Sequence, residues 1–152
     1  GSALDYATVV QHLAPCGLDC SRCLYFGVGK TKAYAAGLRR EMEGFEKVAP
    51  MLAQGEAPVL KQYHAFNSIL DHLAAGNCVG CRDGAVCFES CVARSCCGEK
   101  SVDFCFQCAE FPCDRNRYPE SLDRRWRAFG ARMREVGVER FYEESLSRPR
   151  YE

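Results

Sequence analysis

The sequence lacks an excess of either charge, any long apolar segment and any convincing run of strand-forming residues. Its 20 Lys and Arg residues are balanced by 20 Asp and Glu residues, so the overall charge points to neither nucleic acid nor an anionic membrane surface. No apolar run approaches the ~20 residues that cross a bilayer, and no secretory signal opens the chain. We therefore expect a cytoplasmic protein without membrane contact, and we interpret Gly1 and Ser2 as a remnant of expression.

Cysteine is absent between Cys23 and Cys78 and after Cys113, although the chain contains 12 cysteines. A disulfide scaffold would scatter cysteines so that bridges join distant loops, whereas these occur in close sets. Two thiolates separated by two residues can chelate one tetrahedral ion, which is the usual half-site of structural zinc. The pattern therefore favours metal binding over disulfides. Three such C-x2-C pairs are present: Cys20/Cys23, Cys78/Cys81 and Cys105/Cys108.

Four thiolates complete one tetrahedral zinc site, so the cysteines predict two to three zinc ions. The simplest local partition places Cys78, Cys81, Cys87 and Cys91 on one ion, and an interleaved, cross-braced pairing remains an alternative. A second set follows along the chain: Cys96, Cys105, Cys108 and Cys113.

The first set, Cys16, Cys20 and Cys23, needs a fourth ligand in this partition. The candidates are Cys97, His12, Asp19 or water. Because neighbouring residues seldom reach one ion together, a buried free thiol is an equally good interpretation of Cys97, which follows Cys96 directly. His12 is also interpreted as a surface or capping residue, and His64 and His72 as structural ones.

The spacing C-x3-C-x2-C at Cys16–Cys23 is also typical of radical S-adenosylmethionine enzymes. Those enzymes use a large α/β barrel, which typically takes ~200 residues or more, and this chain is too short and shows no β/α alternation. A small iron–sulfur protein remains an alternative to zinc, although Cys105–Cys113 lacks the closely spaced third cysteine of bacterial ferredoxins.

Helical periodicity dominates the segments without cysteine, and it predicts a mainly α protein with little or no β structure. A break is expected within 30–52 at Gly37, Gly44 or Pro50. A short helix at 88–97 would bring Cys87 and Cys91 to one face. The predicted helices are Leu4–Leu13, Lys30–Leu52, Val59–Ala75, Phe88–Cys97, Glu120–Val136 and Val138–Leu146.

By length, residues 1–152 are expected to form a single small domain, with helices packed around cysteine-rich zinc-binding loops. Along the chain we expect a helical part at 3–75, a metal-rich core at 77–114 and C-terminal helices at 119–147. Zinc would also explain how loops so poor in apolar residues fold, since metal-binding energy becomes folding energy.

Five blocks in this order resemble the bacterial and archaeal family catalogued as domain of unknown function 3795. The blocks are CGLDCSRC with Leu-Tyr (16–25), NCVGCRDG (77–84), CFESCVARSC (87–96), EKSVDFCFQCAEFPCD (99–114) and RPRY (148–151). The resemblance implies metal binding, most plausibly of zinc, and no established activity. It implies as ligands Cys16, Cys20, Cys23, Cys78, Cys81, Cys87, Cys91, Cys96, Cys105, Cys108 and Cys113, with Cys97 extra to the pattern.

Two classes of function are compatible with these observations. The first is a structural-zinc interaction module, whose partner is a protein or a nucleic acid contacted by the arginine-rich segment Arg115–Arg134. Arginines opposite an apolar helical stripe are, however, also the ordinary solvated face of a helix. The second is a small metalloenzyme or redox protein that uses an open position at Cys16, Cys20 and Cys23. No nucleophile–base pair accompanies that trio, so the sequence favours the module.

Overall fold

The computed structural model describes residues 4–152, so Gly1, Ser2 and the start of the predicted 3–75 segment lie outside the described residues. Seven α-helices and four 3₁₀ turns form the regular structure of the described part, which confirms the mainly α prediction. The chain divides into two compact units: unit 1, up to Ser21 together with Val79–Glu152, and unit 2, Arg22–Cys78. The single-domain organisation stays a prediction. In residues 4–152, no helix combines the length and the apolar character that a membrane span requires.

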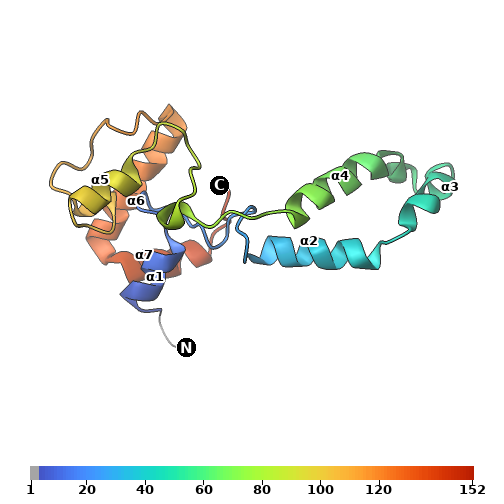
Figure 1. Ribbon diagram of the computed structural model, residues 1–152, viewed down its shortest axis with the longest axis horizontal. Helices are drawn as coiled ribbons and strands as arrows, with labels where there is room; N and C mark the ends of the chain where they lie inside the picture. Colours follow the sequence, from blue (N-terminus) through green and yellow to red (C-terminus); the bar gives the residue numbers. More distant parts are fainter. Residues whose placement is uncertain (1–3) are drawn as a thin grey trace. The chain divides into compact units, whose positions relative to one another are not determined.

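Unit 1 is organised around three helices whose apolar stripes meet in one core. The buried side chains of this core include Val9, Phe104, Met133 and Phe141. The predictions of helices at 120–136 and 138–146 are confirmed, and Gly137, with a φ of 89°, makes the turn between them. The elements of unit 1 are α1 (Tyr6–His12), η3 (Cys81–Asp83), α5 (Ala93–Glu99), η4 (Cys105–Gln107), α6 (Glu120–Val136) and α7 (Val138–Leu146) (Figure 1).

The expected helix at 88–97 is wrong in its position. Helix α5 begins at Ala93, so Cys87 and Cys91 precede it and do not share a helical face. The reason is a distant cap: the backbone N–H of Val92 donates to Oδ1 of the buried Asn116 over 2.8 Å. This bond satisfies a backbone donor at the helix start, where no intrahelical acceptor exists. The cap comes from 24 residues away, so local periodicity could not reveal it.

Unit 2 is built on two helices that pack side by side (Figure 1). Its core cluster is small and consists of Ala35, Leu70 and Ala74, and Ala49 and Ala53 are buried as well. The expected break within 30–52 is present after α2, where Gly44 adopts a φ of 85°. The elements of unit 2 are α2 (Lys30–Glu41), η1 (Phe45–Lys47), α3 (Ala49–Ala53), η2 (Pro58–Gln62) and α4 (Tyr63–Ala74).

Backbone pairing joins the two ends of unit 2. The N–H of Cys78 donates to the carbonyl of Tyr25 over 2.9 Å, and the N–H of Gly27 donates to the carbonyl of Cys78 over 2.9 Å. This bridge and a second one, between Leu13 and Asp19 in unit 1, are the only β pairings in residues 4–152.

Gly130, in the middle of α6, leaves room for the ring of Phe111. A Cβ atom at residue 130 would lie 2.3 Å from Cζ of Phe111, far inside van der Waals contact. The same ring packs edge-on against Trp126, with 4.9 Å between ring centroids. Gly130 therefore allows the loop after η4 to lie directly on α6.

Substitution of Gly130 separates helix propensity from packing. Ala normally stabilises a helix interior by about 1 kcal/mol relative to Gly, but the clash with Phe111 predicts that Gly130→Ala destabilises unit 1 by about 1–3 kcal/mol. Gly98→Ala in α5 is the control, because a Cβ there meets no atom within 4 Å. We expect Gly98→Ala to raise the free energy of unfolding measured in urea. Equal effects of the two variants would contradict the packing argument.

Candidate metal centre

Ten of the twelve cysteines belong to unit 1, and Cys23 and Cys78 belong to unit 2. None of the twelve, all of which lie within residues 4–152, forms a disulfide. The boundary between the units therefore separates Cys20 from Cys23 and Cys78 from Cys81. It also divides two predicted ligand sets, Cys16/Cys20/Cys23 and Cys78/Cys81/Cys87/Cys91. Those two ligand sets stay predictions.

Part of unit 1 brings together thiols from three segments of the chain. The pKa of Cys81 is raised to about 11 by burial and then by the neighbouring sulfurs of Cys91, Cys20 and Cys87. Burial also raises the pKa of Cys16, and Cys91 again contributes. The hydroxyl of Tyr118 lies 3.1 Å from Sγ of Cys91. These five cysteines form what we call the first thiol group: Cys16, Cys20, Cys81, Cys87 and Cys91.

A second set of sulfurs surrounds one small space, which we call the thiol cavity. Its volume is about 30 Å³, enough for one small bound species, since a cavity of about 10–15 Å³ by this measure already holds one water molecule. Helix α5, η4 and the loop after η4 supply the cysteines, and α6 supplies Trp126. The five cysteines that line it are Cys96, Cys97, Cys105, Cys108 and Cys113. The structure therefore brings together the whole predicted second quartet and adds Cys97.

Cys97 and Cys105 are neighbours in this cavity. Cys97 is 5% exposed, which agrees with its interpretation as a buried thiol, and its Sγ donates to Sγ of Cys105 over 4.0 Å. This contact is the main reason why the pKa of Cys105 falls to about 7 and that of Cys97 rises. The indole of Trp126 also lowers the pKa of Cys105.

The indole N–H of Trp126 is a buried donor without an acceptor. Trp126 is 2% exposed, and among residues 4–152 no atom accepts a hydrogen bond from its Nε1. Leaving such a donor unsatisfied costs about 1–3 kcal/mol. The indole lies close enough to Cys105 to lower the pKa of that thiol, and a thiolate there would be a better acceptor than a neutral thiol because charge strengthens the hydrogen bond.

Two cationic side chains stand beside the cavity and share one carboxylate. Arg115 donates from Nη1 to Sγ of Cys96 over 3.4 Å and from Nη2 to Glu110 over 3.1 Å. Lys100 also pairs with Glu110, whose backbone N–H donates to Sγ of Cys108 over 3.4 Å. Positive charge and N–H donors therefore face the sulfurs, as anionic thiolates require. Nevertheless, no three Cys, His, Asp or Glu side chains in the described part of the chain converge in the geometry of a metal site.

A family model described as "Protein of unknown function (DUF3795)" matches residues 12–118. The chain belongs to this family. No curated protein and no solved structure matches it. The family match covers all twelve cysteines but ends before α6, so Trp126 lies outside the matched region.

His12 and Asp19, the two candidate ligands other than cysteine and water, both form hydrogen bonds with other side chains. Nδ1 of His12 lies 2.8 Å from the hydroxyl of Tyr142, and the two rings pack with their centroids 5.4 Å apart. The buried carboxylate of Asp19 accepts a hydrogen bond from Ser21 over 2.5 Å. Of the other histidines, His72 contacts the hydroxyl of Tyr25 over 3.2 Å. These contacts favour the structural interpretation of His12 and His72.

The arginine-rich segment 115–134 is largely neutralised by its own neighbours. On α6, Arg124, Arg127 and Arg132 form ion pairs with carboxylates of α6 and α7. Arg134 instead donates to the carbonyl of Phe106 over 2.8 Å, and Arg125 lies over the ring of Phe129. Ion pairs of this kind lower the positive potential available to phosphate, so binding of nucleic acid by this segment stays a prediction with little support from the contacts.

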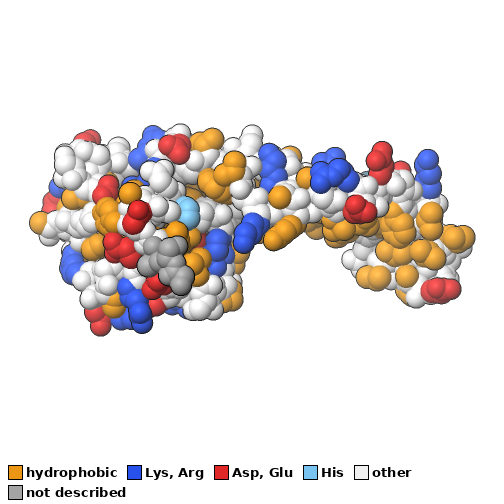
Figure 2. All heavy atoms as spheres, turned by 90° about the horizontal axis from the view of Figure 1, so that it is seen from below, with side chains coloured by type: hydrophobic (Ala, Val, Ile, Leu, Met, Phe, Trp, Pro, Cys, Tyr) orange, Lys and Arg blue, Asp and Glu red, His pale blue; other side chains and the backbone are white. Residues whose placement is uncertain are grey.

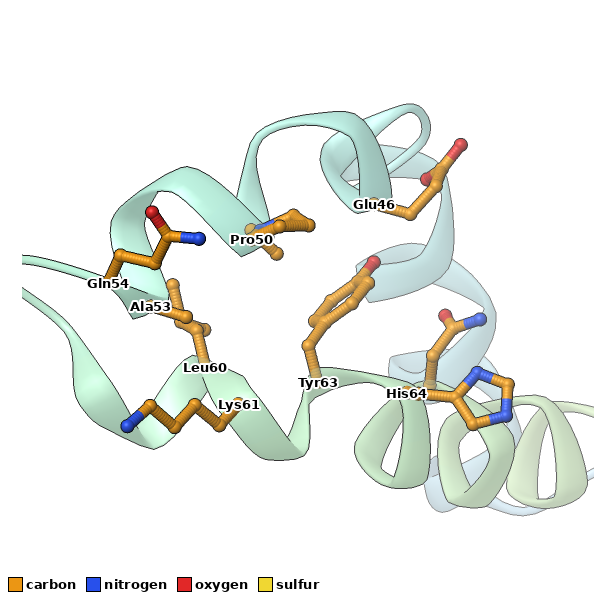
Figure 3. Close-up of a pocket in the computed structure, with 10 residues that line it drawn as sticks. Glu46, Pro50, Ala53, Gln54, Leu60, Lys61, Tyr63 and His64 are labelled. Carbon is orange, nitrogen blue, oxygen red and sulfur yellow. The ribbon is translucent and has the colours of Figure 1, made fainter.

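Unit 2 contains a groove of about 550 Å³ between α3 and the η2–α4 segment (Figure 3). Figure 3 shows Gln54 and Lys61 at one end and Glu46 at the other, with the hydroxyl of Tyr63 directed between them. The lining is mostly apolar and is completed by Ala49, Pro50, Ala53, Leu60, His64 and Asn67.

Sequence reasoning missed the residues that surround the sulfurs. Trp126 is indistinguishable from a core residue because it falls on the apolar stripe of α6. Arg82 carries no signal either, yet its guanidinium donates to the carbonyls of Leu13 and Asp103, over 2.8 Å each, and lies over the ring of Phe104. These bonds join the segments that carry Cys16, Cys81 and Cys105.

Replacement of Arg82 tests whether this linkage supports the site. Arg82→Met keeps the stem but removes both charged hydrogen bonds, each worth about 1.5–3 kcal/mol, so we expect a loss of more than about 2 kcal/mol in the free energy of unfolding. Arg124→Met is the control, because an exposed helical ion pair contributes about 0.5 kcal/mol or less. Denaturation in urea measures both. A loss at residue 82 no larger than at residue 124 would contradict the proposed linkage.

Proposed function

We propose that this member of the DUF3795 family is a zinc-binding protein in which the metal has a structural role, and that unit 2 carries its interaction surface. One observation carries the first part: five cysteines and a buried indole N–H without an acceptor surround a space of about 30 Å³. A space of that size is suited to a single ion. Thiolates are ligands that zinc prefers in closed structural sites.

The charge around the cavity supports the same proposal. Four thiolates on one Zn²⁺ carry a net charge of −2, which Lys100 and Arg115 would partly compensate. The lining residues include no carboxylate and no imidazole, so within the described residues the cavity provides ligands and cations rather than a general base. Four of the five thiols of the first thiol group are proposed to hold a further ion, because structural zinc takes four ligands. This arrangement is interleaved, since it combines thiols of Cys16 and Cys20 with thiols of Cys81, Cys87 and Cys91.

Elemental analysis and the visible spectrum of the full chain test the metal. We expect two to three zinc ions per chain, no colour, and loss of helical circular dichroism when a strong chelator removes the zinc, because zinc binding supplies folding energy. Iron with a brown colour would instead support the iron–sulfur alternative. A metal-free protein that keeps its fold would contradict the proposal.

The groove of unit 2 supports the interaction part of the proposal. The segments that form the groove also carry exposed apolar side chains, with Met51 67% and Val59 73% exposed, and Figure 2 shows hydrophobic side chains gathered over this end of unit 2. Exposed apolar patches of this kind mark protein interaction sites. Lys61 has no ion pair within residues 4–152, so the proposed occupant is an apolar segment of a partner protein with an acidic residue beside Lys61.

Selection from a phage-displayed random peptide library on the intact protein tests this occupant. We expect enriched peptides to combine apolar residues with an acidic one, and Lys61→Glu to weaken their binding severalfold. Lys47→Glu is the matched control, because it makes the same charge change outside the groove lining. Enrichment of peptides without an acidic residue, or equal effects of the two variants, would rule out the proposed occupant.

A further inference from the structure

Two adjacent cysteines, Cys96 and Cys97, both line the thiol cavity, and the geometry distinguishes between them. Successive residues of an α-helix project about 100° apart, so both sulfurs of this pair do not readily converge on one ion. We propose that Cys97, and not Cys96, binds the ion of the thiol cavity together with Cys105, Cys108 and Cys113. This inference rests on the proposed zinc site and reverses the assignment that the family pattern implies.

The distance between sulfurs supports Cys97. Two thiolates bound tetrahedrally to one zinc at about 2.3 Å lie about 3.8 Å apart. Sγ of Cys97 and Sγ of Cys105 lie 4.0 Å apart, so a small adjustment would bring both to one ion. This pair thus has the separation that two ligands of one zinc require.

Cys96 has a different partner. Its sulfur accepts from the guanidinium of Arg115 over 3.4 Å, and Arg115 is itself held by Glu110. The side chain of Arg115 is 47% exposed, so this hydrogen bond holds Cys96 toward the solvent side of the cavity. Cys96 is also less buried than Cys97. We assign Cys96 to the rim of the cavity, as a thiol held by Arg115.

The unsatisfied N–H of Trp126 supports metal binding by the neighbouring sulfurs over their burial as neutral thiols. Cysteine is often buried simply as a small apolar residue, which would explain Cys97 alone. It would not explain why an N–H donor without an acceptor lines the same cavity. A metal-bound thiolate at Cys105, the neighbour of Cys97, would provide the acceptor that a neutral thiol provides only weakly.

The single variants Cys96→Ser and Cys97→Ser of the full chain test the assignment, since each changes one sulfur to oxygen at adjacent positions. We expect Cys96→Ser to retain the wild-type zinc content and the wild-type resistance to a competing chelator. Cys97→Ser is expected to lose one zinc per chain, or to release that zinc at a chelator concentration at least tenfold lower. Cobalt substitution gives a second readout, because the sulfur-to-metal charge-transfer absorption should weaken in Cys97→Ser only.

If Cys97→Ser does not fold, alkylation of the wild-type protein can still show which of the two cysteines is protected by zinc. With zinc bound, mass spectrometry should find Cys96 modified by iodoacetamide and Cys97 protected, and chelation should expose Cys97. Loss of zinc in Cys96→Ser, or in both variants equally, would overturn the assignment while leaving zinc binding intact. Unchanged zinc in both would also overturn it. Wild-type protein without zinc would instead overturn the proposed function.

Discussion

The crowding of five cysteine sulfurs around about 30 Å³ is the constraint on which the rest of unit 1 depends. Neutral thiols accept hydrogen bonds weakly, so they leave the indole of Trp126 unsatisfied, whereas thiolates without a cation would repel one another. A bound cation would resolve both problems at once. The neighbouring structure serves this arrangement: Asn116 fixes where α5 begins, and Gly130 lets Phe111 and Trp126 close the cavity.

Ion pairs with one carboxylate hold the two cationic side chains beside the thiol cavity in place. Glu110 lies between Lys100 and Arg115 and pairs with both, so the two cations are held near the sulfurs without extending freely into solvent. Its own backbone N–H donates to Cys108. One short segment therefore provides a ligand candidate, a hydrogen-bond donor and the anchor for two cations. Such an arrangement would suit the structural metal proposed above, because its charges are paired within the protein.

Sequence periodicity predicted the helices at 120–136 and 138–146 because their apolar stripes are local and regular. Cysteine spacing likewise predicted that Cys96, Cys105, Cys108 and Cys113 belong together, and they line one cavity. The position of α5 was missed because Asn116 caps it from a distant loop. Cys97 was considered only as a fourth ligand of the first set or as a buried thiol, since adjacency to Cys96 says nothing about which sulfur faces Cys105. What could not be predicted depends in each case on contacts between segments far apart in the sequence.

Unit 2 differs from unit 1, because its helical structure contains few cysteines and its buried core is small. Ala35, Leu70 and Ala74 bury little surface, and hydrophobic stabilisation scales with the apolar area removed from water. Larger side chains such as Met51 and Val59 remain exposed on the segments that form the groove. A partner that covers the groove, as proposed above, would remove from water apolar surface that the core of unit 2 leaves exposed. On this proposal unit 1 would gain stability from the groups that surround its sulfurs, and unit 2 from its partner.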